Sequence, residues 1–129
     1  MSQFLGVYPI SGEDLTALPV KAIGPAVVFY QTVLGFTVVS QDATTAVVQR
    51  DAAQLGLVAQ PNHAPREAGS CAFSVTDLDA LHAELAARGG APGQFGIDEW
   101  GGKKYRTFFL REDENGYCYC FHCPASREA

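Results

Sequence analysis

The sequence has little positive charge and no long apolar run. It contains 9 Lys and Arg against 14 Asp and Glu, which gives a formal net charge of -5 at pH 7. The basic residues are scattered apart from Lys103, Lys104 and Arg106, which argues against a nucleic-acid partner. No apolar stretch approaches the roughly 20 residues that cross a bilayer, and the first residues do not resemble a signal peptide. We therefore expect a cytoplasmic protein with no nucleic-acid or membrane partner.

The chain has only four cysteines, and their placement argues against a fold held together by disulfides. Three of the four cysteines, Cys118, Cys120 and Cys123, are too close together in the sequence to connect distant segments. The chain has 129 residues, of which 47% are hydrophobic, so it can bury a core without disulfides or metals. The composition therefore predicts one globular domain over residues 1–129 with reduced thiols.

The order of predicted elements occurs twice along the chain. The first module, over about residues 14–60, is predicted as a strand at 15–20, a helix at 24–35 and strands at 36–40, 45–50 and 54–60. A linker follows at 61–69, where prolines and turn residues interrupt any apolar period. The second module, over about 70–124, is predicted as a strand at 70–75, a helix at 76–88, a strand at 93–97 and a hairpin at 103–124.

The signals at the element boundaries support this assignment. Pro25 suits the first turn of the first helix, and Gly35 suits its end. Thr76 and Asp79 have the spacing of a capping box for the second helix. Asn115-Gly116 is a strong turn signal inside the closing hairpin. The expected fold is α+β, with two βαβββ modules forming a curved mixed sheet around a cleft and helices on its outer face.

Three segments, at residues 29–36, 73–81 and 109–116, resemble the glyoxalase/bleomycin-resistance/dioxygenase superfamily, also called the vicinal oxygen chelate fold. The resemblance extends from about Leu15 to Pro124. It implies a deep cleft built from paired modules, and a homodimer in which the subunits often complete each other's cleft. The turn contains Asp-Glu-Asn-Gly where the family usually has Asp-Pro-Asp-Gly, which preserves the turn chemistry.

The resemblance also implies where a metal would be bound in an enzymatic member. The four family positions fall at Leu15, Gly56, Ser70 and Cys120, and none of these is a usual ligand of the family. Hard divalent metals prefer carboxylate oxygens and imidazole nitrogens. We therefore expect no metal cofactor and no catalytic residue, and the alternative is a divalent metal held by atypical ligands.

The last predicted strand alternates two kinds of side chain. One face carries Cys118, Cys120 and His122, and the other carries Tyr117, Tyr119 and Phe121. We place the first set in the cleft and the aromatic residues under the helices. Cys118, Cys120 and His122 could form a soft-metal site or contain a reactive thiol, but free cysteines more commonly serve as small apolar wall residues.

Aromatic residues provide the other candidate ligand-binding groups. Trp100 could stack on a flat or cationic ligand, or it could cover the rim or a dimer interface. Tyr105, Thr107 and Phe109 share one strand face, which we prefer as cleft lining over the face with Phe108 and Leu110. Ser70, Cys118 and Cys120 complete the predicted ligand-binding set, whereas Tyr30 and Phe36 are assigned to the core.

The function expected from these observations is metal-independent binding of a small organic molecule, such as a toxic or drug-like compound that the protein would sequester. The first alternative is a metal-dependent lyase, isomerase or dioxygenase of the same superfamily. The second is a structural or regulatory module with a closed cleft. The sequence alone leaves the identity of the ligand open.

Overall fold

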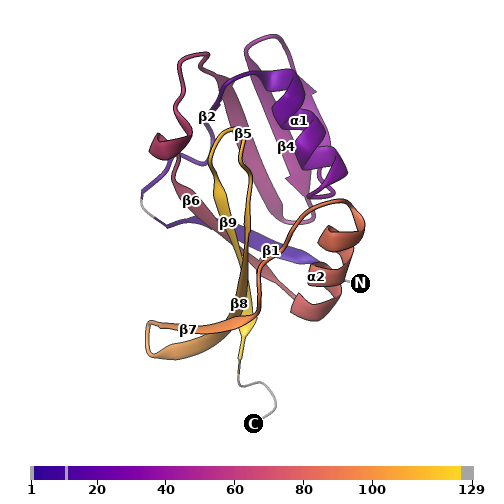
Figure 1. Cartoon of the computed structure of the whole chain (residues 1–129), viewed down its shortest axis with the longest axis vertical. Helices are drawn as coiled ribbons and strands as arrows, with labels where there is room; N and C mark the ends of the chain where they lie inside the picture. Colours follow the sequence, from indigo (N-terminus) through magenta and orange to yellow (C-terminus); the bar gives the residue numbers. More distant parts are fainter. Residues whose placement is uncertain (1, 11, 126–129) are drawn as a thin grey trace.

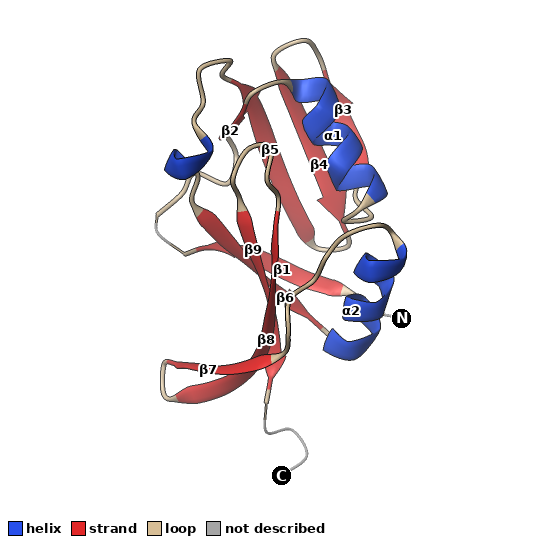
Figure 2. Ribbon diagram, viewed as in Figure 1, coloured by secondary structure: helices blue, strands red, loops and turns tan. Residues whose placement is uncertain are grey.

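The structure is a computed structural model that describes residues 2–10 and 12–125. These residues form two sheets and two α-helices, which confirms the predicted α+β class (Figures 1 and 2). The strands are β1 (Phe4–Pro9), β2 (Leu18–Val20), β3 (Thr37–Gln41), β4 (Thr45–Arg50), β5 (Ala53–Ala59), β6 (Ser70–Val75), β7 (Gly96–Trp100), β8 (Lys103–Arg111) and β9 (Cys118–Pro124). The helices are α1 (Ile23–Thr32) and α2 (Leu78–Ala87), with a 3-10 turn η1 (Pro65–Glu67) between the modules.

The two modules have the same topology. The first forms a four-stranded sheet in the order β2-β5-β4-β3, and the second contributes β6-β9-β8-β7 to a five-stranded sheet. In each module the first strand runs parallel to the last, and the remaining neighbours are antiparallel. Helix α1 packs on β3, β4 and β5, and α2 packs on β8 and β9. The predicted βαβββ duplication is therefore present, with each module forming its own hydrogen-bonded ladder.

Strand β1 is an element that the sequence analysis did not assign. It pairs antiparallel with β6 and becomes the fifth strand of the larger sheet. The Phe4 ring makes edge contacts with Phe36 of the first module and with Phe73 and Phe121 of the second, at centroid distances of 5.7, 5.3 and 6.1 Å. Phe4 is 1% exposed, so β1 contributes a core side chain that contacts both modules.

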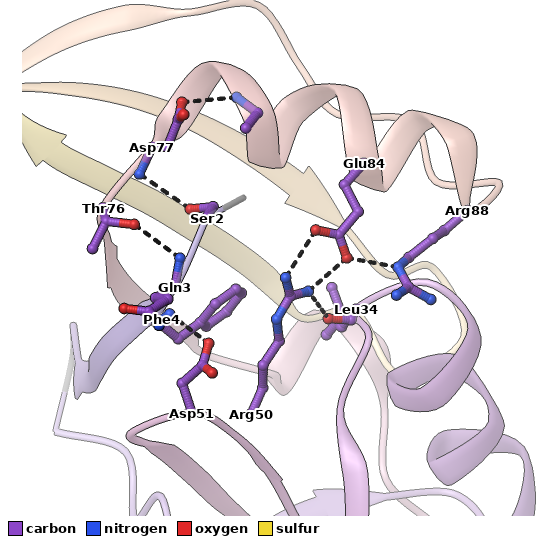
Figure 3. A network of polar contacts seen from close by, with 11 residues as sticks. Ser2, Gln3, Phe4, Leu34, Arg50, Asp51, Thr76, Asp77, Glu84 and Arg88 are labelled. Atoms are coloured by element: carbon purple, nitrogen blue, oxygen red, sulfur yellow. Dashed lines mark hydrogen bonds and ion pairs between the residues drawn. The ribbon is translucent and has the colours of Figure 1, made fainter.

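Polar contacts hold β1 at the junction of the modules (Figure 3). The Phe4 backbone N–H donates to Asp51 Oδ2 at 2.8 Å, and the Gln3 N–H donates to Thr76 Oγ1 at 2.9 Å. The Asp77 N–H donates to Ser2 Oγ at 3.1 Å. These bonds connect β1 to the end of β4 and to the start of α2. They satisfy backbone groups that the β1–β6 ladder leaves unpaired.

The start of α2 differs from the predicted capping box. Asp77 is the N-cap residue, and its side chain accepts a hydrogen bond from the Ala80 N–H at 3.0 Å. Thr76 is unsuited to this role because its hydroxyl oxygen accepts the Gln3 N–H, and Asp79 forms an ion pair with Arg106. The sequence thus contained a correct start signal one residue away from the predicted one, because Thr and Asp are both good N-caps.

Two strand predictions shift in position. Strand β7 lies at Gly96–Trp100 where 93–97 was predicted, because Gly93 bonds through its N–H to the Phe109 carbonyl as part of a loop. The β7–β8 connection is a two-residue hairpin at Gly101-Gly102, and both glycines have positive φ. Strand β2 is shorter than predicted and lies at a sheet edge, which suits Pro19.

The closing hairpin is confirmed, but its turn is wider than a two-residue Asn-Gly turn. Arg111 is paired with Cys118, and only Gly116 of the Asn-Gly pair has positive φ. Asn115 has negative φ and is buried, with its N–H donating to the Glu112 carboxylate and its Oδ1 accepting the Lys21 N–H at 2.7 Å. The asparagine therefore anchors the turn to the first module.

The core is continuous across the modules. Tyr30 and Phe36 lie in it, as predicted, together with Phe73, Tyr119 and Phe121. None of the four cysteines, which all lie in the described part of the chain, forms a disulfide. No helix in the described part of the chain is long and apolar enough to cross a membrane.

Candidate functional site

A half-open cavity of about 980 Å³ lies on the face of the five-stranded sheet that the helices leave free. Its walls come from β1, β6, β7, β8 and β9 and from residues flanking them. The opposite face of β9 carries Tyr119 and Phe121, which are fully buried. The described residues that line this cavity all belong to the second module or to the N-terminal segment with β1. Within one chain, therefore, the cavity is not enclosed between the two modules.

The structure brings together most of the predicted ligand-binding residues. Trp100, Tyr105, Phe109, Ser70 and Cys120 all line the cavity. This matches the preferred strand parity, because β8 directs Tyr105 and Phe109 toward the cavity and buries Phe108 and Leu110 in the core.

Two residues of the predicted set are not part of the lining. Thr107 is 2% exposed, and its hydroxyl donates to Asp98 Oδ2 at 3.1 Å. It therefore supports the Asp98 carboxylate from below the surface. Cys118 is half-buried and does not line the cavity, although its register partner on β6, Ser70, does. Both residues have the parity that was predicted, but neither reaches the open space.

Trp100 and Tyr105 form a stacked aromatic wall. Trp100 ends β7 opposite Lys103, and Tyr105 is two residues further along β8, so the two side chains are diagonal neighbours on the same face. Their ring centroids are 4.4 Å apart with an interplanar angle of 13°. Trp100 is 43% exposed, which leaves aromatic surface open to a ligand.

His122 stands edge-on to this wall. Its ring centroid lies 5.4 Å from both Trp100 and Tyr105, at interplanar angles of 85° and 83°. Tyr8 of β1 lies on another side, at 6.5 Å. Burial lowers the pKa of His122 below its ordinary value of 6.5, so the imidazole is neutral at pH 7.

Negative charge dominates the rim of the cavity. Asp98 and Glu99 both belong to the lining, and no Lys or Arg does so among the described residues. A cleft with two carboxylates and exposed aromatic rings suits a neutral or cationic flat molecule and disfavours an anion.

Two of the cysteines, Cys71 and Cys120, do not have the properties of a nucleophile. Burial, with a smaller contribution from Asp98, raises the pKa of Cys120 to about 12. Burial also raises the pKa of Cys71 to about 12, and this residue is on the core face of β6. A thiol with such a pKa is protonated at neutral pH and reacts slowly. This argues against Cys120 as the reactive thiol.

Three of the four residues at the family's metal positions, Leu15, Gly56 and Cys120, do not suit a hard divalent metal. Leu15 has no donor atom in its side chain, and it binds Gly56 through its backbone carbonyl at 2.9 Å. A Cβ at Gly56 would collide with the Thr16 carbonyl oxygen, so no ligating side chain could be accommodated there without moving the backbone. The Cys120 thiol is a soft ligand, unlike the carboxylate oxygens and imidazole nitrogens that hard divalent metals prefer.

No alternative cluster replaces those positions. Within residues 2–10 and 12–125, no three His, Cys, Asp or Glu side chains are arranged so that they could hold a metal ion. This includes the set Cys118, Cys120 and His122. The spacing of alternate residues on one strand keeps their side chains apart.

The sequence analysis missed the contribution of β1 to the cavity. Tyr8, Pro9 and Ile10 line it, with Tyr8 and Ile10 each 51% exposed. The apolar run at residues 4–10 was the available signal, but it is short and gives no alternation that would have identified a strand. His122 was placed in the cleft, but it was considered only together with Cys118 and Cys120, as a metal ligand or beside a reactive thiol, and not as a ligand-binding residue.

The comparisons with known proteins agree with this fold. The family model described as Glyoxalase/Bleomycin resistance protein/Dioxygenase superfamily matches residues 14–120. The chain belongs to this superfamily, as its paired βαβββ modules indicate. Compared with curated protein sequences, the chain has no significant match.

Similar solved structures include three bleomycin-related proteins. A bleomycin resistance determinant encoded on the transposon Tn5 is 21% identical, with a TM-score of 0.73 over 88% of this chain and 98% of that one. A bleomycin-binding protein complexed with bleomycin is 22% identical, with a TM-score of 0.73 over 89% of this chain and 100% of that one. The bleomycin-binding protein from bleomycin-producing Streptomyces verticillus, complexed with copper(II)-bleomycin, is 28% identical, with a TM-score of 0.65 over 97% and 100% of the two chains.

Proposed function

We propose that this chain is a metal-independent small-molecule binding protein of the glyoxalase/bleomycin-resistance type, which sequesters a flat, toxic or drug-like organic compound. The observation that carries the proposal is the stacked Trp100–Tyr105 wall in a cavity of about 980 Å³. A cavity of this size suits a drug-sized ligand. The similarity to solved bleomycin-binding proteins supports the same class of function.

Binding without a reaction is consistent with the chemistry of the cleft. The Cys120 thiol is protonated at neutral pH, and the residues at Leu15 and Gly56 offer no side-chain donor to a metal. Sequestration requires only affinity and a sufficient concentration of the protein. The neutral aromatic walls and the carboxylates of the rim supply contacts for affinity.

We also propose that the protein acts as a cytoplasmic homodimer. The cavity is open, and four apolar residues that line it, Tyr8, Ile10, Trp100 and Phe109, are between 43% and 51% exposed. A second copy that placed its first module over this face would enclose the ligand and cover these side chains, which agrees with the subunit arrangement common in the family. Sedimentation equilibrium at micromolar concentration tests this, and a monomer would contradict it.

The ligand is best identified from the purified protein. Native mass spectrometry should reveal a co-purifying organic compound, and elemental analysis without chelator should find less than stoichiometric metal. A thermal-shift series with Ni, Zn, Mn and Fe should leave the Tm unchanged. Stoichiometric metal, or clear stabilisation by one of these ions, would overturn the binding-only function in favour of an enzyme.

A further inference from the structure

His122 is a buried polar side chain without a protein partner, located in the cleft itself. It is 8% exposed, and its Nδ1 atom is buried without a hydrogen bond in the described structure. Its register neighbours on the adjacent strands are Ser74 and Thr107, but the Thr107 hydroxyl donates to Asp98 instead. Almost all buried polar atoms in proteins are paired, and Nδ1 is an exception. Among the described residues, no protein hydrogen bond therefore sets the tautomer of this imidazole, and its second nitrogen, Nε2, is available to a ligand in the cleft.

The aromatic wall determines how a ligand would meet this imidazole. Trp100 and Tyr105 are nearly parallel to each other, and the His122 ring is nearly perpendicular to both. A flat ring that stacks parallel to the wall therefore presents its edge to His122. Because Nδ1 is enclosed, Nε2 is the nitrogen that such an edge can reach.

The charges in the cleft indicate which hydrogen-bonding groups the edge of the ligand ring should carry. Asp98 and Glu99 are acceptors, and the described lining contains no Lys or Arg side chain that would donate to an anion. The ligand should therefore carry hydrogen-bond donors. No protein group fixes which nitrogen of His122 carries the proton, so a donor on the ligand can select the tautomer with its lone pair on Nε2.

We infer that His122 is a specificity-determining residue, whose Nε2 accepts a hydrogen bond from an N–H group at the edge of a flat, neutral or cationic ring stacked against Trp100. The ligand class is thus an amino-substituted or protonated nitrogen heterocycle. This inference rests on the proposed binding function. It adds a polar contact that distinguishes such compounds from flat molecules without donors, because the latter would leave Nε2 desolvated and unpaired.

Two acridine dyes of the same charge test the inference. 9-Aminoacridine is a flat cation at neutral pH with N–H donors, and 10-methylacridinium is a flat cation of similar size without one. The wild-type protein should bind 9-aminoacridine more tightly than 10-methylacridinium, by about tenfold for one hydrogen bond. Dye fluorescence measured against protein concentration gives both dissociation constants.

Three variants assign the difference to one atom. His122→Phe preserves the ring shape without nitrogen and should reduce 9-aminoacridine affinity by about tenfold while leaving 10-methylacridinium unchanged. In His122→Gln, the side-chain amide extends about as far from the backbone as Nε2 does, so this variant should recover part of the affinity for 9-aminoacridine. In His122→Asn, the amide extends only as far as Nδ1, so this variant should not recover that affinity. Circular dichroism and Tm confirm that each variant is folded, and if His122→Phe fails to fold, the Gln-Asn difference remains the test.

The possible results separate this inference from the proposed function. If His122→Phe binds both dyes as the wild type does, the inference is overturned, and the binding function remains. If the wild type binds neither dye, the inferred ligand class is overturned, and the mass spectrum of the co-purifying compound decides the binding function independently. A dye preference that is lost in His122→Phe and recovered in His122→Gln supports the inference.

Discussion

The hydroxyl groups of Tyr30 on α1 and Tyr119 on β9 lie 2.9 Å apart inside the core. The two residues belong to different modules, are 2% and 1% exposed, and pack with their rings nearly perpendicular. Burial raises the pKa of both phenols well above the ordinary value of 10.0, so both remain protonated. The bond connects the modules through neutral groups.

Removing either hydroxyl should destabilise the protein by about 1–3 kcal/mol, because the remaining hydroxyl stays buried without a partner. Tyr30→Phe and Tyr119→Phe combined should cost less than the sum of the two single changes, since the double variant leaves neither hydroxyl unpaired. Urea unfolding of the four proteins measures this coupling. Strictly additive effects would mean that the bond contributes no coupling between the modules.

Replacing Trp100 by Ala should weaken binding of a flat ligand by about 1–3 kcal/mol, because stacking on an aromatic ring contributes on this scale. Phe95→Ala is the matched control, since Phe95 is similarly exposed, at 41%, and does not line the cavity. Titration of 9-aminoacridine against both variants provides the comparison. Unchanged affinity in Trp100→Ala would assign Trp100 to the rim or to a dimer interface.

The ion pair between Arg50 and Glu84 connects β4 to α2 (Figure 3). The Arg50 guanidinium donates to both carboxylate oxygens of Glu84, at 2.9 and 2.8 Å, and also to the Leu34 carbonyl. Glu84→Ala should therefore destabilise the protein by about 1–3 kcal/mol. The exposed pair Arg106–Asp79 is the control, and Asp79→Ala should cost less than about 1 kcal/mol. Thermal and urea unfolding test the ranking, and equal costs would contradict it.

The Arg50–Glu84 ion pair also predicts how the free energy of unfolding depends on pH. Burial opposes ionisation of Glu84, but the hydrogen bonds from Arg50 and Arg88 outweigh it and lower the pKa below 4.5. Its contribution to stability is therefore present above pH 4.5 and is lost as the pH falls through the lower, folded-state value. In Glu84→Ala, the acid slope of the unfolding free energy should be smaller than in the wild type.

The pKa of Glu112 is shifted in the opposite direction to that of Glu84. Burial raises its pKa above 4.5 despite the N–H bonds from Asn115. Ionisation is thus disfavoured in the folded state, and stability decreases as the pH rises from 4.5 through the folded-state pKa. Glu112→Gln should remove this decrease while keeping an acceptor for the Asn115 N–H. Unfolding free energies measured between pH 4 and 8 test this, and an identical pH profile in the variant would contradict it.

The failures of the sequence analysis have a common physical origin. Thr76 and Asp77 were both suited to cap the start of α2. The hydroxyl of Thr76 accepts the Gln3 N–H instead, and Asp77 caps the helix. Asn115 had the sequence signal of a tight turn, yet its contacts with Glu112 and Lys21 favoured a wider one. In both cases, tertiary contacts outweighed the local conformational preference of the residue: Gln3 binds Thr76, and Lys21 and Glu112 bind Asn115.

The sequence by itself determined the duplicated βαβββ order and the faces of β8 and β9, because apolar period and strand alternation are local properties of the chain. It also identified most of the aromatic cleft, since Tyr105 and Phe109 follow from that alternation and Trp100 was predicted as a stacking residue from the resemblance to the family. Only the tertiary structure revealed that β1 joins the second sheet and that Nδ1 of His122, a residue that strand alternation had already placed in the cleft, has no hydrogen-bond partner among the described residues. Both depend on long-range packing: a strand pairs with whichever free edge lies beside it, and a polar atom is unpaired only relative to every group that surrounds it.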